Sequence, residues 1–253
     1  MIIRFCTILL FCLAASPSYA FSGIKNELSE AQTLLSKDDF NGAIAIYEGL
    51  LARGYYSADL HYNLGCSHYE QKATGRALLN FERALKYSPN HKKAYNNIET
   101  IKSEQSNPIY EVQAFFLKKI WLNLSNSISP GAWAILSLTF LGGVAYLFFL
   151  LMFKKNSYSH KLLLWLIAIL LLLFLISLFA GKSRLSSFQN NPYAIVMSEV
   201  NRYSGPSEMS IVDEDKIPEG TKVHVLEELS GWYKVSLPDL DQVWLTEDMF
   251  EKI

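Results

Sequence analysis

The longest apolar stretches of the chain are two runs rich in Leu, Ile and Phe. These runs, residues 131–153 and 162–181, contain no charged side chain. An α-helix rises about 1.5 Å per residue, so each run is long enough to cross a hydrocarbon core of about 30 Å. We therefore predict two transmembrane helices, whose partner is the lipid bilayer.

The segments that flank these runs predict how the chain crosses the membrane. Residues 1–20 have the pattern of a secretory signal peptide, with Arg4 before an apolar run and a cleavage pattern of small residues that ends at Ala20. The loop 154–161 holds three lysines, which favours a cytoplasmic position. Together these features predict that both soluble parts lie on the non-cytoplasmic side. An uncleaved N-terminal anchor is the alternative for the first segment.

The segment before the first run, residues 108–130, has apolar residues at helical spacing. Ile109, Val112, Phe116 and Ile120 repeat every three or four positions, with lysines nearby. This pattern predicts a helix that lies in the membrane interface, and a plain helical linker is the alternative.

Residues 21–107 show a helical period with small and aromatic residues at fixed positions. From residue 58 onward the positions fit the 34-residue tetratricopeptide pattern. They are Leu64, Gly65, Ala77, Phe81, Ala84 and Pro89, and Ala43, Tyr47 and Leu50 precede three of them by 34 residues. We predict two helical hairpins followed by a capping helix.

The first helices of such repeats line a concave face that commonly binds a peptide or a partner helix. On this face we place four candidate protein-binding residues: Gln32, Tyr62, Tyr69 and Asn96. The spacing of Tyr62 and Tyr69, two helical turns, predicts that both rings project into the groove. The alternative is that the two tyrosines only cover the hydrophobic core.

The last part of the chain alternates apolar and polar residues in short runs. Val223 and Val225 mark one strand, and Trp232 and Val235 are assigned to the next. Turns are predicted around Gly205, at 218–220 and at 230–231. After a linker at 182–192, residues 193–253 are therefore predicted to be all-β.

Residues 193–253 resemble a bacterial SH3 domain. The resemblance rests on an Arg-x-Ser-Gly-Pro loop at 202–206, a Pro-x-Gly turn at 218–220 and the sequence Gly-Trp-Tyr-Lys-Val at 231–235. It implies a small SH3-like barrel, so the predicted fold class is multi-domain: α-helical repeats, two transmembrane helices and an all-β barrel. Tyr203, Tyr233 and Trp244 are the candidate ligand surface of the barrel. Alternatively the aromatic residues form its core, which we favour for Trp232 and Trp244.

Charge and motif content exclude several functions. Acidic residues outnumber basic ones by 13 to 5 over 190–253, which disfavours binding to nucleic acid. His61, Cys66 and His68 lie close in sequence, but they do not share a helical face, so we predict no metal site and buried histidines instead. Catalytic and cofactor-binding motifs are not found, and we expect a protein that is not an enzyme.

The order of these parts, together with the sequence YNLGCSHYEQKATGRALLNFERALKYSPN at 62–90, resembles the E-type proteins of the Bat (Bacteroides aerotolerance) family. The resemblance implies a bacterial inner-membrane protein with periplasmic soluble domains. It also implies a supporting role, with von Willebrand A-type Bat proteins as partners, in a complex for oxidative or envelope stress tolerance. The alternative function is a cell-wall tether whose SH3-like domain binds peptidoglycan peptides.

Overall fold

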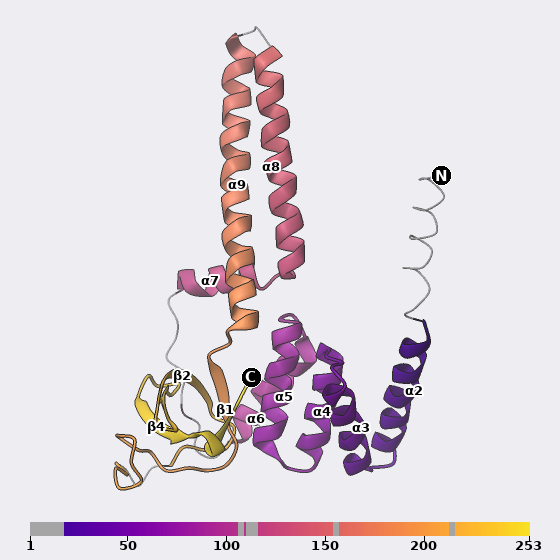
Figure 1. Ribbon diagram of the computed structural model, residues 1–253, viewed down its shortest axis with the longest axis vertical. Helices are drawn as coiled ribbons and strands as arrows, with labels where there is room; N and C mark the ends of the chain where they lie inside the picture. Colours follow the sequence, from indigo (N-terminus) through magenta and orange to yellow (C-terminus); the bar gives the residue numbers. More distant parts are fainter. Residues whose placement is uncertain (1–17, 106–108, 110–115, 154–156, 213–215) are drawn as a thin grey trace, which may run out of the picture.

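The computed structural model describes residues 18–105, 109, 116–153, 157–212 and 216–253. Figure 1 shows a hairpin of two long helices above a layer that contains helical repeats and a β-sheet side by side. The helices are α2 (Ser18–Leu35), α3 (Phe40–Ala52), α4 (Ala58–Glu70), α5 (Thr74–Tyr87), α6 (Lys92–Glu104), α7 (Phe116–Ser125), α8 (Pro130–Phe153) and α9 (Ser157–Gln189). The strands are β1 (Tyr193–Val196), β2 (Lys222–Leu229), β3 (Trp232–Ser236), β4 (Gln242–Thr246) and β5 (Phe250–Lys252).

Helices α2 to α6 form two helical hairpins and one further helix, as the repeat pattern predicts. The residues assigned to the repeat core are buried, including Ala43 and Tyr47 in the first hairpin and Ala77 and Phe81 in the second. Helices α4 and α5 cross at Gly65, where an added Cβ would lie 2.7 Å from Cε1 of Phe81. Only glycine permits this approach, because real Cβ atoms do not come so close to a ring.

Most of the predicted signal peptide lies outside the described residues. Helix α2 begins at Ser18 and continues without a break past Ala20, the predicted cleavage position. The prediction of cleavage is therefore neither confirmed nor contradicted.

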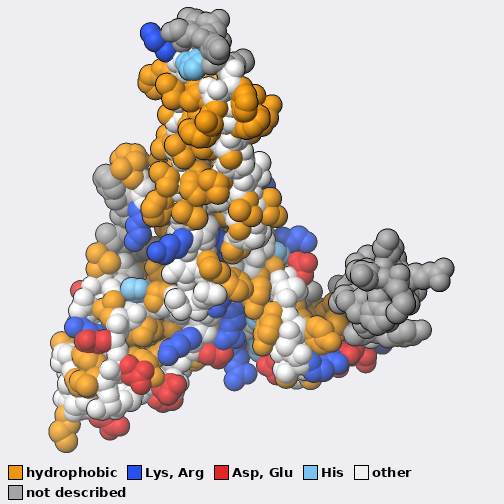
Figure 2. Space-filling model, turned by 45° about the horizontal axis from the view of Figure 1, so that its top comes forward, with side chains coloured by type: hydrophobic (Ala, Val, Ile, Leu, Met, Phe, Trp, Pro, Cys, Tyr) orange, Lys and Arg blue, Asp and Glu red, His pale blue; other side chains and the backbone are white. Residues whose placement is uncertain are grey.

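Helices α8 and α9 are long and apolar enough to cross a membrane. Their apolar side chains are mostly exposed along the hairpin, and acidic side chains are gathered below it on the face that Figure 2 shows. Helix α9 is longer than the predicted span, since it includes residues 157–161 of the predicted loop and 182–189 of the predicted linker. A charged residue ends an apolar run but does not end a helix, so parts of the predicted loop and linker are helical.

Small residues hold the two long helices together. Ser137 and Ser177 lie 2.8 Å apart through their hydroxyl oxygens, and both hydroxyls donate to the carbonyl oxygen of Trp133. Gly181 lies against Trp133, where an added Cβ would be 3.0 Å from the Cβ of the tryptophan. Close approach of backbones and shared hydroxyl bonds are typical of helix pairs in lipid.

Helix α7 lies across the base of the hairpin (Figure 1). It exposes Phe116, Leu117 and Ile120. The described part of the predicted helix runs from Phe116 to Ser125. Ile109 is not part of it and instead packs against the core of the β-sheet, while Val112 lies outside the described residues.

The strands form an antiparallel sheet in the order β4-β3-β2-β1-β5. The sheet is open, with β4 and β5 at its edges, whereas the sequence predicts a closed barrel. The backbone of β4 makes one further contact, in which the amide of Trp244 donates to the carbonyl of Tyr203 at 2.8 Å. The turn at Ser230 and Gly231 has positive φ at both residues, which is typical of a type I′ hairpin.

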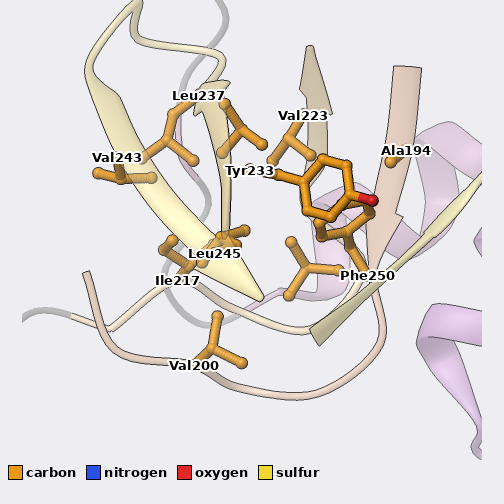
Figure 3. Close-up of a cluster of buried hydrophobic side chains, with 11 residues drawn as sticks. Ala194, Val200, Ile217, Val223, Tyr233, Leu237, Val243, Leu245 and Phe250 are labelled. Atoms are coloured by element: carbon orange, nitrogen blue, oxygen red, sulfur yellow. The ribbon is translucent and has the colours of Figure 1, made fainter. Parts of the chain in front are cut away.

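Alternation along the strands decides which aromatic residues fill the core of the sheet. Tyr233 and Val235 point inward from β3, as do Val243 and Leu245 from β4 (Figure 3). Successive residues point to opposite faces, so Trp232 and Trp244 lie on the other side and are only half-buried. The prediction that these tryptophans form the core was therefore wrong, because Trp232 and Val235 do not share a face.

The sheet packs directly against the repeats. Ile195 and Ile253 belong to the same hydrophobic cluster as Leu78 and Ile98. Around this cluster, Lys222 pairs with Glu82 at 2.7 Å, and Arg83 pairs with Glu251 at 2.8 Å. The two parts that the sequence presents as separate domains are therefore docked.

We predict that Gly65→Ala destabilises the repeats by about 1–3 kcal/mol, because the new methyl group overlaps the Phe81 ring. The full chain in detergent should show a lower midpoint of thermal unfolding by far-ultraviolet circular dichroism. Gly49→Ala is the matched control, since its Cβ would meet no atom within 4 Å on helix α3. An equal effect of the two substitutions would show that the crossing is not tightly packed.

We also predict that Gly220→Ala loosens the docking of the sheet onto the repeats. Gly220 has a φ of +82° and its Cβ would overlap Cδ1 of the buried Leu78. Gly231→Ala introduces the same strain at a φ of +81° but meets no atom within 4 Å. Hydrogen exchange should rise in both α5 and β1 for Gly220→Ala only, and exchange confined to the β-sheet would contradict the docking.

Candidate protein-binding groove

A groove lies along the helices α2, α4 and α6, the first helices of the successive repeats. Its lining is polar apart from one aromatic ring. The lining residues are Gln32, Asp59, Tyr62, Asn63, Asn90, His91, Lys92 and Lys93. The opposite face of the repeats includes α5, which the β-sheet covers. The groove is therefore a face of the repeats that the rest of the described chain leaves open.

Tyr62 forms the aromatic part of the groove. Its ring packs against Phe81 at 5.8 Å and against His91 at 4.9 Å between centroids. Burial, and secondarily the thiol of Cys66, raises the pKa of Tyr62 to about 12. The hydroxyl therefore stays protonated and donates to the sulfur of Cys66, while the ring lines the groove.

Cys66 lies beneath Tyr62 in the same region. The side-chain nitrogen of Asn97 is 3.7 Å from its sulfur. Burial raises the pKa of the Cys66 thiol, and hydrogen bonds from Tyr62 and Asn97 offset only part of this effect. The thiol is thus mainly protonated at neutral pH, so it is a poor nucleophile and behaves as a small packing residue.

The structure separates the two tyrosines that the sequence pairs. Tyr69 does not line the groove, and its hydroxyl donates to the carboxylate of Glu104 at 3.0 Å. This hydrogen bond is the first cause that raises the pKa of Tyr69. Tyr69 therefore ties α4 to the end of α6, and the prediction that both rings project into the groove holds only for Tyr62.

Helix α6 contributes Lys92 and Lys93 to the groove, and not the predicted Asn96. Asn96 is exposed and is not among the residues that line the groove. The neighbouring Asn97 faces α4 through its contact with Cys66. The buried positions Ala94, Ile98 and Ile101 place Asn97 beside the core face, and this signal was present in the sequence.

One end of the groove carries most of its charge. His91 caps α6, since its Nδ1 accepts from the amide of Ala94 at 3.1 Å, and its Nε2 lies 3.3 Å from the Asp59 carboxylate. Lys92 and Lys93 follow directly and are exposed. Ammonium groups beside the side-chain amides of Gln32 and Asn63 suit the carbonyl and carboxylate oxygens of a peptide.

The candidate ligand surface on the β-sheet is not an exposed surface. Tyr203 and Tyr233 are buried, and Trp244 is half-buried. Tyr203 packs edge to face against Trp232 at 5.3 Å, and Tyr233 packs against Phe250 at 5.2 Å. These aromatic residues stabilise the sheet rather than line a groove.

His61 and His68 are buried, as predicted from their places in the repeat. Nδ1 of His61 lies 3.1 Å from Oδ1 of Asn80, and its ring packs against Tyr56 and Tyr87, which also stack on each other. Burial lowers the pKa of both imidazoles, so both are neutral at neutral pH. Within the described ranges, no three His, Cys, Asp or Glu side chains are grouped as metal ligands would be.

The paired helices and their open groove define a helical-repeat interaction module. Residues 58–91, which comprise α4, α5 and the turn after them, match the tetratricopeptide repeat family model. Repeats of this family generally mediate contacts between proteins. A comparison with curated proteins gave no match.

Proposed function

We propose that the protein is a membrane-anchored scaffold, without catalytic activity, that binds another protein in the groove of its repeats. The observation that carries this proposal is the position of the groove. The sheet covers α5 on one side of the repeats, whereas Gln32, Tyr62 and Lys93 remain available on the other. A polar groove with one aromatic ring suits an extended peptide or a helix of a partner.

The docking of the sheet onto the repeats supports a two-span topology. The hydrogen bond from the Gly75 amide to Glu219, 2.6 Å long, joins segments before and after the hairpin. Such a contact cannot form through a bilayer, so a hairpin that crosses the membrane leaves both modules on one side. The exposed apolar residues of α7 suit a helix in the interface at the base of the hairpin.

The proposed setting is the bacterial inner membrane, with the modules in the periplasm. The support for this setting is the basic loop at 154–161, the signal-like segment 1–20 and the resemblance to E-type Bat proteins. A von Willebrand A-type Bat protein is the proposed partner, in a complex for stress tolerance. The alternative of a peptidoglycan tether has less support, because Tyr203 and Tyr233 are buried and cannot contact a wall peptide.

We predict that Gln32→Ala combined with Lys93→Glu weakens partner binding by about tenfold, because each change removes a donor from the groove. Both side chains are exposed, so the fold should be retained. The measurement is quantitative co-purification of the von Willebrand A-type partner from detergent-solubilised membranes. Lys102→Glu, on the opposite side of α6, is the control. Full recovery of the partner with the double variant would show that the partner does not bind in the groove.

We predict that single cysteines at Ser103 and Ser207, in a chain without other cysteines, react with a membrane-impermeant thiol reagent in spheroplasts. A cysteine at Ser157, at the far end of the hairpin, should react only after lysis, because the basic connector remains inside. Opposite reactivity at Ser103 and Ser207 would contradict the docked arrangement. Reactivity at Ser157 alone would reverse the proposed orientation.

A further inference from the structure

A second cavity lies between the repeats and the base of the membrane hairpin. It is formed by the turn after α5, the loop between α7 and α8, and the end of α9. Its polar lining includes Ser88, Asn126, Ser129 and Arg184, and its apolar lining includes Tyr87 and Phe188. Asn90 lines both this cavity and the protein-binding groove, whereas the six residues named here line only this cavity.

Arg184 is the unusual member of this cavity. The residue is buried, with only 6% of its surface exposed. One terminal nitrogen, Nη2, donates to the carbonyl oxygen of Lys86 at 2.7 Å, but the buried Nε has no hydrogen-bond partner. The ion pairs within the described part of the chain do not include Arg184. A buried guanidinium with a spare donor and no acidic partner is suited to an anion from outside the chain.

A helix terminus adds to the positive potential of the cavity. Helix α8 begins at Pro130, which lines the cavity, so the positive end of the helix dipole lies at this cavity. Ser129 caps the helix, since its Oγ accepts from the amide of Ala132 at 3.2 Å. Hydroxyl and amide side chains at Ser88 and Asn126 supply further donors. These groups together favour a ligand with several oxygen atoms and a negative charge, such as a phosphate diester.

The apolar wall indicates where such a phosphate comes from. Phe188 packs edge to face on Tyr87 at 5.5 Å between centroids. Farther along the hairpin, beyond residues 182–187, α8 and α9 expose apolar side chains (Figure 2). A phosphate held here would have hydrocarbon on one side and the repeats on the other. This is the position of a lipid headgroup, provided that the hairpin is in a membrane as proposed above.

We propose that this cavity binds the phosphate group of an anionic phospholipid, with Arg184 as its cation and the start of α8 as its second source of positive potential. The bound headgroup would neutralise the buried guanidinium and hold the repeats against the membrane surface. A basic pocket at a membrane boundary is a common way to bind anionic headgroups.

The test uses the full chain in a neutral detergent and native mass spectrometry. The probes are dioleoylphosphatidylglycerol, dioleoylphosphatidylcholine and inorganic phosphate. We expect phosphatidylglycerol to bind in preference to phosphatidylcholine, and millimolar inorganic phosphate not to displace it. Arg184→Gln should raise the lipid concentration for half-occupancy about tenfold or more, because a charge-assisted hydrogen bond is lost. Lys182→Gln is the matched control, since it removes an exposed charge from the same helix.

A second pair of variants keeps the test decisive if Arg184→Gln does not fold. Asn126→Asp adds a negative charge to the cavity without a change in size, and it should weaken lipid binding. Asn123→Asp makes the same change on the exposed side of α7 and should have no effect. Equal binding of both lipids, displacement by inorganic phosphate, or full lipid binding in both Arg184→Gln and Asn126→Asp would overturn the proposal.

The lipid titration is also separate from the test of the scaffold function. It is performed in detergent and does not require the partner protein. Loss of the lipid site with partner co-purification intact would overturn only the lipid proposal. If the chain binds the lipid normally but no partner co-purifies with it from solubilised membranes, only the proposal of a scaffold would be overturned.

Discussion

Helix α5 depends at both ends on side chains from the other half of the chain. At its start, the capping position is Ala73, which has no side chain that can accept a hydrogen bond, and the Glu219 carboxylate accepts instead from the Gly75 amide at 2.6 Å. A carboxylate at this end also interacts favourably with the helix dipole. At the other end, Arg184 of α9 donates to the carbonyl of Lys86 at 2.7 Å. The repeats, the membrane hairpin and the sheet are therefore joined through a single helix.

This arrangement explains why one face of the repeats is free and the other is not. A short tetratricopeptide array buries little apolar surface of its own, and its stability depends on what covers its ends and faces. Here Ile195 and Ile253 of the sheet complete the cluster around Leu78, and the half-buried pair of Lys222 and Glu82 adds a contact between the sheet and the repeats. The open groove on α2, α4 and α6 is thus presented by a body that the sheet supports, at a set distance from the membrane hairpin.

Local features of the fold could be predicted from the sequence, whereas contacts between distant segments could not. The repeat positions of Gly65, Ala77 and Phe81 depend on helix crossing alone, and their burial was predicted. The bond between Gly75 and Glu219 spans 144 residues, and no periodicity reports it. In the candidate site, Gln32 and Tyr62 line the groove on the face to which the repeat register assigns them, and their role in binding stays a prediction. Asn96 does not line the groove, because α6 contributes to it only through Lys92 and Lys93 at its start, one turn before Asn96.

The same difference between local pattern and tertiary structure governs how Arg184 is understood. In the sequence it is one of several charged residues after an apolar run, and such a residue indicates only how the chain is oriented across a membrane. In the structure it is buried with a free donor, at a cost that a protein interior rarely bears without a partner. The hairpin directly above it exposes apolar side chains, which is equally unfavourable in water. In the proposed membrane setting a bilayer would remove both costs together, because its hydrocarbon would cover the hairpin and its headgroups would supply the anion.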